Sequence, residues 1–232
     1  VPLSLSNLCE DHQFGIFEVG MSKSGEINRL SKIIKPNLAI ITNIGEAHIE
    51  NFNNTQGIAK AKSEIINNIQ NNGTLILNRD DKFFDYLSNK AKSKNIKVVT
   101  FGKSKKSEIN LIHTKKYGET KKIIVRVQDE TFKLKIKNIN IYNVLAALSV
   151  LKELNLDLKK TTQLFYNFKP YEGRGKIYKI KRYKKDFRII DESYNANPSS
   201  VKTALKNFKE IKKDRFKKYL LLGDMLELGE KS

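Results

Sequence analysis

The chain has 232 residues, of which 39% are hydrophobic, and this is enough to form a buried core in one large or two ordinary domains. No apolar run approaches the roughly 18 residues that a membrane span needs, so membrane insertion is not expected. The net charge of +19 comes largely from scattered lysine pairs without interleaved aromatic residues, which favours solvated lysine faces and attraction to anionic nucleotides over a nucleic-acid-binding surface.

Short apolar runs alternate with helical patterns, which predicts an α/β protein with a mostly parallel sheet. Four strands are expected in the first part of the chain, at residues 14–19, 38–42, 74–77 and 97–101. A helix is expected over residues 57–69, because its apolar residues recur every three to four positions.

The pattern changes after about residue 108. Residues 123–127 and 131–136 alternate apolar and polar side chains around a turn at 128–130, which predicts a hairpin, and a helix is expected over 141–154. Residues 173–176 look like a linker. A β-α-β unit should follow, with a strand at 187–191, a helix at 199–211 and a strand at 219–222. We therefore expect one domain over residues 1–169 and a second over 170–232.

Polar residues at the ends of the predicted strands are the first candidates for a site, because open α/β sheets bind ligands beyond the carboxyl ends of their strands. They are Glu18, Asn43 with His48 five residues later, Asp191 and Asp224. A single polar residue at a strand end can equally mark the point where the chain reaches the solvent, but several such residues at one sheet edge favour a site. Glu18 suits Mg²⁺, which prefers oxygen ligands, whereas His48 is a less usual ligand for this ion and can serve instead as a hydrogen-bonding group.

Two further features have competing interpretations. Lys62 lies on the predicted helix at 57–69, and composition alone makes it a solvated charge. Residues 191–198 (DESYNANP) join a strand to a helix, and they can serve as turn formers or as a nucleotide clamp. No G-x-x-x-x-G-K-[ST] loop occurs in these 232 residues, so we expect an incomplete triphosphate site and no ATP hydrolysis by these residues alone.

The single cysteine, Cys9, excludes an intrachain disulfide and fits a reducing cytoplasm. Because the sequence suggests no base near it, Cys9 is expected to be a small buried side chain rather than a catalytic thiol. The opening Val1-Pro2-Leu3 and the closing Glu230-Lys231-Ser232 read like interior sequence, and both ends are expected to be cut.

Eight segments, in this order, resemble the Mur ligase family. They are FEVGM at 17–21 with GEI at 25–27, ITNIGEAHIE at 41–50, GIAKAKSEI at 57–65, LNRDD at 77–81, NIYNVLAA at 140–147, GR at 173–174, DESYNANP at 191–198, and LGDMLELG at 222–229. The resemblance implies most of the family's central ATPase domain, without its P-loop, followed by the first half of a Rossmann-like C-terminal domain. Only residues 104–137 contain no recognisable motif.

The resemblance also implies roles for individual residues. Glu18, His48 and Lys62 are expected to hold two Mg²⁺ ions, with Lys62 carbamylated by CO₂, and His48 and Lys62 are the catalytic candidates. Carbamylation turns a cation into a carboxylate that metal can bind. Six residues are expected to contact the nucleotide or line the cleft: Asn143 on the adenine side, then Arg174, Asp191, Tyr194, Asn195 and Asn197. Glu192 stands where the family often has a second Asp, and it is assigned no role.

Within the family, the segments at 194–198 and 223–229 resemble the member that adds D-alanyl-D-alanine to UDP-N-acetylmuramoyl-tripeptide. The implied reaction is ATP-dependent ligation through an acyl phosphate, in cytoplasmic peptidoglycan synthesis, by a monomer. Three alternatives stay open: a relative of the folate-adding folylpolyglutamate synthases, a basic nucleic-acid-binding protein, and a catalytically inactive module.

Overall fold

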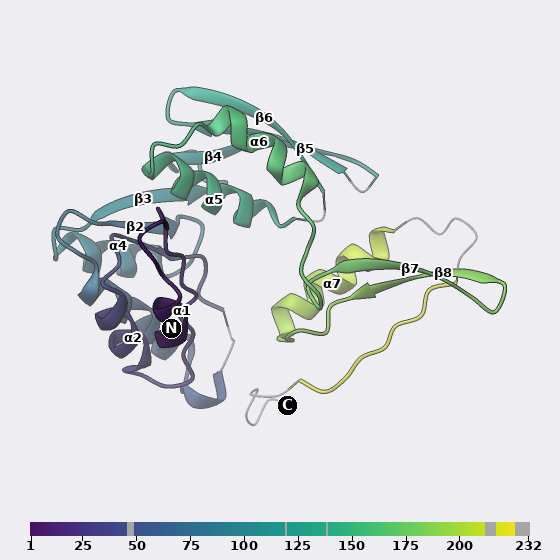
Figure 1. Cartoon of the computed structure of the whole chain (residues 1–232), viewed down its shortest axis with the longest axis horizontal. Helices are drawn as coiled ribbons and strands as arrows, with labels where there is room; N and C mark the ends of the chain where they lie inside the picture. The colour runs from purple at the N-terminus through teal and green to yellow at the C-terminus, as the bar shows by residue number, and fades with distance from the viewer. Residues whose placement is uncertain (46–48, 119, 138, 212–216, 226–232) are drawn as a thin grey trace. The chain divides into compact units, whose positions relative to one another are not determined.

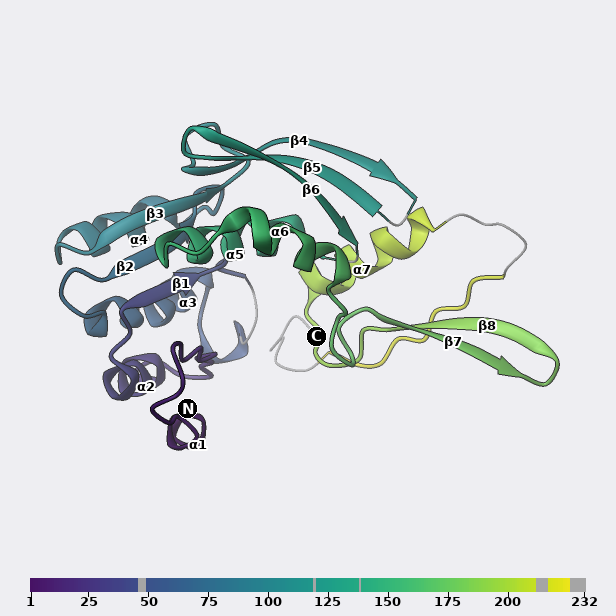
Figure 2. The same cartoon turned by 45° about the horizontal axis from the view of Figure 1, so that its top comes forward.

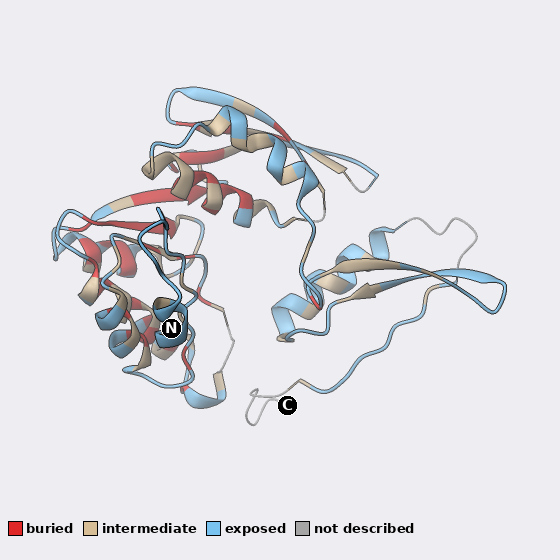
Figure 3. Ribbon diagram, viewed as in Figure 1, coloured by how far each residue is buried: buried red, intermediate tan, exposed pale blue. Residues whose placement is uncertain are grey.

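The computed structural model describes residues 1–45, 49–118, 120–137, 139–211 and 217–225 (Figure 1). The chain forms two compact units. The first comprises Val1–Ile44 and Asn54–Phe168, and the second comprises Gly45–Asn53 and Lys169–Ser232. The first unit contains most of the buried side chains (Figure 3).

The first unit is built on a six-stranded mixed sheet, whose strands lie side by side in chain order (Figures 1 and 2). The strands are β1 (Leu38–Ile41), β2 (Thr74–Asn78), β3 (Lys97–Gly102), β4 (Ile109–Tyr117), β5 (Thr120–Val127) and β6 (Glu130–Lys137). Strands β1 to β4 pair in parallel, and β5 and β6 add to β4 as an antiparallel meander. The predicted α/β class and mostly parallel central sheet are therefore confirmed.

The helices of the first unit are α1 (Pro2–Ser6), α2 (Glu26–Ile34), α3 (Thr55–Lys62) with the 3₁₀ helix η2 (Ser63–Asn68), α4 (Phe84–Lys92), α5 (Ile141–Glu153) and α6 (Leu158–Asn167). Helices α3, α5 and α6 begin at an N-cap side chain. The Asn54 side chain caps α3 by accepting hydrogen bonds from two backbone N–H groups, and Asp157 caps α6 in the same way. Glu64 of η2 accepts hydrogen bonds from the N–H groups of Gly25 and Asn28, which fixes the start of α2.

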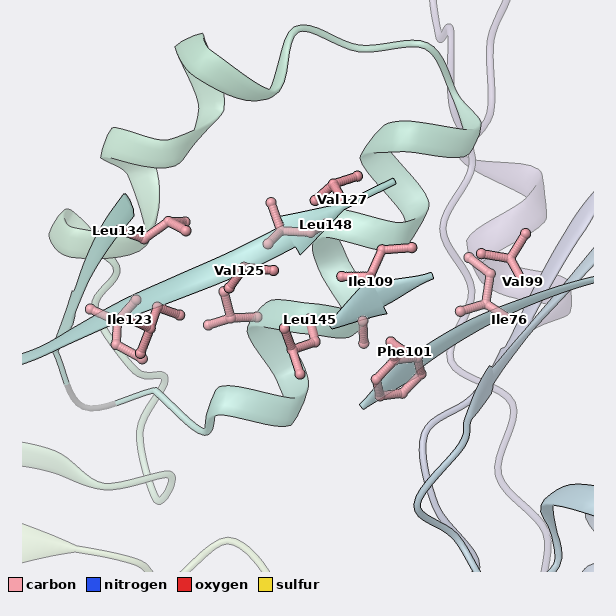
Figure 4. Close-up of a cluster of buried hydrophobic side chains, with 13 residues drawn as sticks. Ile76, Val99, Phe101, Ile109, Ile123, Val125, Val127, Leu134, Leu145 and Leu148 are labelled. Carbon is pink, nitrogen blue, oxygen red and sulfur yellow. The ribbon is translucent and has the colours of Figure 1, made fainter. Parts of the chain in front are cut away.

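Both faces of the parallel part of the sheet are covered. Leu75 and Leu77 of β2 are buried on one face, and Ile76 between them is buried on the other, because successive strand residues point to opposite sides. Helices α4 and α5 both pack against β2 and β3. The core on the α5 side joins Phe101 of β3 to Leu145 of α5 and continues along the sheet (Figure 4).

The antiparallel end of the sheet has one buried face. Ile123, Val125 and Val127 of β5 alternate with more exposed residues, and β4 is buried only at its first two positions (Figure 3). The stretch without a motif, residues 104–137, thus supplies three strands that extend the central sheet. The hairpin predicted around residues 128–130 is confirmed, and the structure adds β4, which the sequence did not indicate.

The second unit contains the short 3₁₀ helix η1 (Ile49–Asn51), the antiparallel pair β7 (Lys176–Arg182) and β8 (Lys185–Asp191), and the helix α7 (Pro198–Glu210). Its two strands form a separate two-stranded sheet. None of the described residues of α7 is buried (Figure 3).

Several predicted elements are wrong. Residues 14–19 and 219–222 form no strand, and Ile16 and Leu221 are 92% and 98% exposed. A strand needs a neighbour for its backbone groups, and an apolar run alone does not supply one. The expected β-α-β unit is instead a hairpin followed by a helix, because β8 pairs with β7, whose first residue lies in the predicted linker. The helix predicted over 57–69 is α-helical to Lys62 and 3₁₀ beyond it.

No helix among the described residues has the length and apolar character to span a membrane.

Candidate functional site

Lys62 lies at the last residue of α3 and reaches the end of β1. Its Nζ donates a hydrogen bond to the backbone oxygen of Asn43, at 2.9 Å. The neighbouring residue Ala61 is fully packed in the core, so the helix holds Lys62 in place beside the sheet. Burial lowers the pKa of the Lys62 amine, while the negative charge of Asp81 opposes this change. The fold therefore favours the neutral amine more than a surface position would.

The loop after β2 presents two successive aspartates that bind different segments. The Asp81 carboxylate accepts hydrogen bonds from the N–H of Ile44, at 2.8 Å, and of Phe83, at 2.9 Å. Asp80 accepts from the N–H of Lys103, at 2.6 Å, and of Ser104, at 3.0 Å, and from the Tyr142 hydroxyl, at 3.0 Å. Both aspartates belong to the LNRDD motif at residues 77–81, for which the sequence indicated no individual roles. The available signal was two adjacent acids directly after a buried strand.

Asn143 lies in the first turn of α5 and its side chain is exposed. Its backbone N–H donates to the oxygen of Asn140, whose side chain caps the helix. The preceding residue, Tyr142, contacts Asp80. Burial, together with the hydrogen bond to Asp80 and the charge of Asp80, raises the pKa of Tyr142 to about 12. The phenol therefore stays protonated and remains a hydrogen-bond donor at neutral pH.

The other predicted metal ligands are not brought to Lys62 by any described contact. Glu18 is exposed in a segment without helix or strand, and His48 lies outside the described residues. Within the ranges that the structure describes, no group of three or more His, Cys, Asp or Glu side chains could hold a metal ion. The chemistry at Lys62 nevertheless fits Mg²⁺ once the amine is carbamylated, since the carbamate and the nearby Asn43 carbonyl are oxygen donors.

In the second unit, Asp191 organises the turn that joins β8 to α7. Its carboxylate accepts from the Gly173 N–H, at 3.1 Å, and from both the N–H and the hydroxyl of Ser193, at 3.1 and 2.6 Å. The Arg174 guanidinium lies over the Tyr194 ring, 4.2 Å from its centroid. The structure thus brings together three predicted site residues, Arg174, Asp191 and Tyr194.

Gly173 makes this arrangement possible. It has φ of +71°, and a Cβ there would lie 2.7 Å from the backbone nitrogen of Tyr194.

Asn197 has a structural role, because it forms a capping box with Ser200 at the start of α7. Asn195 and Asp224 are exposed. Glu192, which has no assigned role, has its carboxyl pKa raised by burial and by the charge of Asp191, with Arg174 opposing.

The hydrogen bonds to Asp191 predict a measurable titration. They lower the pKa of its carboxyl below the ordinary value of 3.8, with the Ser193 side chain as the largest cause. Their contribution to the stability of the folded state is present above pH 3.8 and is lost as the pH falls through the lowered pKa of Asp191. We expect Ser193→Ala to raise the Asp191 pKa toward 3.8, as measured by carbon-13 NMR of the carboxyl group. Ser199→Ala, on the exposed first turn of α7, is the control. An unchanged midpoint in Ser193→Ala would contradict the assignment.

The comparison with known families decides the classification. A family model described as the Mur ligase middle domain matches residues 1–151. The chain belongs to the Mur ligase family. This confirms the resemblance that the eight sequence segments indicated.

Relatives of this Mur ligase chain match it over almost its full length. The UDP-N-acetylmuramoyl-tripeptide--D-alanyl-D-alanine ligase of Rickettsia prowazekii is 33% identical over 98% of the chain and 50% of the relative. A crystal structure of MurF from Acinetobacter baumannii aligns with a TM-score of 0.84 and 26% identity, over 100% of this chain and 49% of that one. The structure of MurF ligase from Thermotoga maritima in complex with ADP aligns with a TM-score of 0.72 and 25% identity, over 93% of this chain and 48% of that one. The chain thus spans about half the length of the relatives it matches.

The prediction for Cys9 in this Mur ligase chain is wrong in both parts. Cys9 is exposed rather than buried, and a base does lie near it, because the His12 Nδ1 is 3.0 Å from its sulfur. The same nitrogen accepts a hydrogen bond from the Cys9 backbone N–H, at 3.1 Å. The imidazole is therefore engaged in a local turn, three residues along the chain, which apolar patterning could not indicate.

Proposed function

We propose that this chain is part of an ATP-dependent ligase that joins D-alanyl-D-alanine to UDP-N-acetylmuramoyl-tripeptide in cytoplasmic peptidoglycan synthesis. The observation that carries the proposal is the match to ligases of that name over nearly all of the chain. The likeness to a MurF structure that contains ADP supports a nucleotide site. Burial of the Lys62 amine at the end of β1 supports the chemistry.

We also propose that the chain contains parts of two domains, with the boundary after residue 169. Residues 1–169 would form the central ATP-binding domain, and residues 170–232 would begin the C-terminal domain. The family match over 1–151 and the end of the first compact unit at Phe168 support this boundary. The whole protein would act as a monomer.

The reaction has two steps. The tripeptide carboxylate attacks the γ-phosphorus of ATP and releases ADP, which gives an acyl phosphate. The amine of D-alanyl-D-alanine then attacks the acyl carbon, phosphate leaves, and the nitrogen loses a proton as the amide forms. Magnesium ions, when bound, neutralise charge on the transferring phosphoryl group. Glu18, His48 and carbamylated Lys62 would hold them at two sites.

The remaining site residues would bind and orient the nucleotide. Asn143, on the exposed first turn of α5, would contact the adenine side. Asp191, which organises the β8–α7 turn, and Arg174, which lies over the Tyr194 ring, would contact the nucleotide from the C-terminal domain. The residues Tyr194, Asn195 and Asn197 would line the cleft. The ring of Tyr194 is already oriented by Arg174, so this pair presents a combined planar and cationic surface.

The test uses the protein as the cell makes it, with any residues that precede Val1 or follow Ser232. We expect phosphate release from ATP only when UDP-N-acetylmuramoyl-tripeptide and D-alanyl-D-alanine are both present, with the pentapeptide product seen by mass spectrometry. L-alanyl-L-alanine is the matched control substrate. Turnover with a folate and glutamate instead would favour the folylpolyglutamate synthase alternative. Strong salt-dependent binding to DNA without turnover would favour the nucleic-acid alternative.

A further inference from the structure

Asp80 joins three parts of the first unit that are distant in sequence. It belongs to the loop after β2, and its own N–H is held by the Asn78 side chain, at 3.0 Å. One carboxylate oxygen accepts from the Lys103 N–H and the Tyr142 hydroxyl, and the other accepts from the Ser104 N–H. Lys103 and Ser104 follow β3, and Tyr142 lies in the first turn of α5. A single carboxylate therefore fixes the position of the α5 start relative to the ends of two parallel strands.

The surroundings of Asp80 are built around this contact. A Cβ on Gly102 would lie 2.7 Å from an Asp80 carboxylate oxygen, so glycine leaves the room that the side chain occupies. The Lys103 ammonium lies 5.3 Å from the centroid of the Tyr142 ring, which adds a second link between the same two segments. Hydrogen bonds to a charged acceptor are stronger and more directional than neutral ones. These contacts thus tie the first turn of α5 to the loop after β2 and to the segment after β3.

The next residue along α5 after Tyr142 is Asn143, the proposed adenine-side contact. We propose that Asp80 is a positioning residue for nucleotide recognition, which acts by holding Tyr142 and the β3–β4 connection so that Asn143 is fixed at the carboxyl edge of the sheet. This inference rests on the proposed function for its link to adenine. The contacts of Asp80 with the α5 turn are independent of whether adenine binds there.

The kinetic test compares Asp80→Asn and Tyr142→Phe in the whole gene product. Asparagine keeps the size of the side chain but turns one acceptor into a donor that faces N–H groups, and phenylalanine removes only the hydroxyl. We expect the KM for ATP to rise about tenfold in Asp80→Asn and about fivefold in Tyr142→Phe, since each loses hydrogen bonds to a charged group. The preference for ATP over GTP should fall by similar factors. The KM for D-alanyl-D-alanine should change less than about twofold.

Asp85→Asn and Tyr117→Phe are the matched controls, because both side chains are exposed and neither contacts Asp80 or Tyr142 in the described residues. They should leave the KM for ATP and the ATP preference unchanged. A merely structural role would lower the melting temperature and the active fraction but not the choice between ATP and GTP. A wild-type ATP preference in both Asp80→Asn and Tyr142→Phe overturns the inference.

A substrate-independent measurement separates this inference from the proposed function. In hydrogen exchange followed by mass spectrometry, the peptide covering residues 140–147 should exchange faster in Asp80→Asn than in wild type or in Asp85→Asn. Equal exchange in all three proteins would refute the positioning of α5 by Asp80. An absence of ligation by the wild-type protein, with faster exchange in the variant, would count against the proposed function and leave the positioning supported.

Discussion

Lys62→Ala is expected to reduce ligation by about a thousandfold or more in the whole gene product. The substitution removes the amine that donates a hydrogen bond to the Asn43 carbonyl just after β1, and with it the carbamate proposed to hold Mg²⁺. Loss of one metal-based stabilisation of the transferring phosphoryl group is worth several kcal/mol, and each 1.4 kcal/mol is about tenfold in rate. The measurement is the kcat for product formation at saturating substrates.

A rescue experiment and a control variant make this prediction specific. Small carboxylates such as acetate should restore part of the activity of Lys62→Ala, because they supply the missing oxygen donors. Lys60→Ala is the control, since Lys60 is exposed and lies two residues away on a different face of α3. Full activity of Lys62→Ala would remove the carbamate role and leave Lys62 as a structural donor to Asn43.

Phe101→Ala should destabilise the first unit by about 3–5 kcal/mol. The Phe101 side chain is completely buried between β3 and α5, so its removal loses both its burial and the packing around the resulting cavity (Figure 4). The chain contains no tryptophan, so urea unfolding should be followed by far-ultraviolet circular dichroism. The expected signal is a lower transition midpoint with an unchanged slope.

Ile112→Ala is the control for Phe101→Ala. Ile112 is 52% exposed in β4, and its truncation should change stability by less than about 1 kcal/mol. Equal losses in the two variants would mean that the cluster around Phe101 is not the main core of this unit.

The parallel part of the sheet could be predicted because its strands are buried on both faces. Residues 74–77 and 97–101 are short, mostly apolar runs, and the structure places β2 and β3 over them. The same signal failed at residues 14–19 and 219–222, where an apolar run finds no partner strand within the described part of the chain. Pairing is a property of two segments, whereas the pattern describes only one. The antiparallel β7–β8 pair was missed for the same reason.

The candidate site was predictable to a smaller extent. Family motifs indicated Lys62, Asp191 and Tyr194, and the structure shows the contacts that order each of them. The role of Asp80 could not be predicted, because its partners at positions 103, 104 and 142 are set by the tertiary arrangement of the strand ends. The metal assignments of Glu18 and His48 stay predictions.

The position of β6 gives the lysine-rich composition a physical consequence. As the last strand of the six, β6 has one row of backbone donors and acceptors with no neighbouring strand among the residues that the structure describes, and such a row is a template for intermolecular pairing. Its exposed positions include Lys133 and Lys135, which alternate with the buried Leu134 and Ile136. A second copy that docked along this border would bring like charges together in a poorly hydrated contact. The lysines of β6 thus disfavour edge-to-edge pairing along this strand.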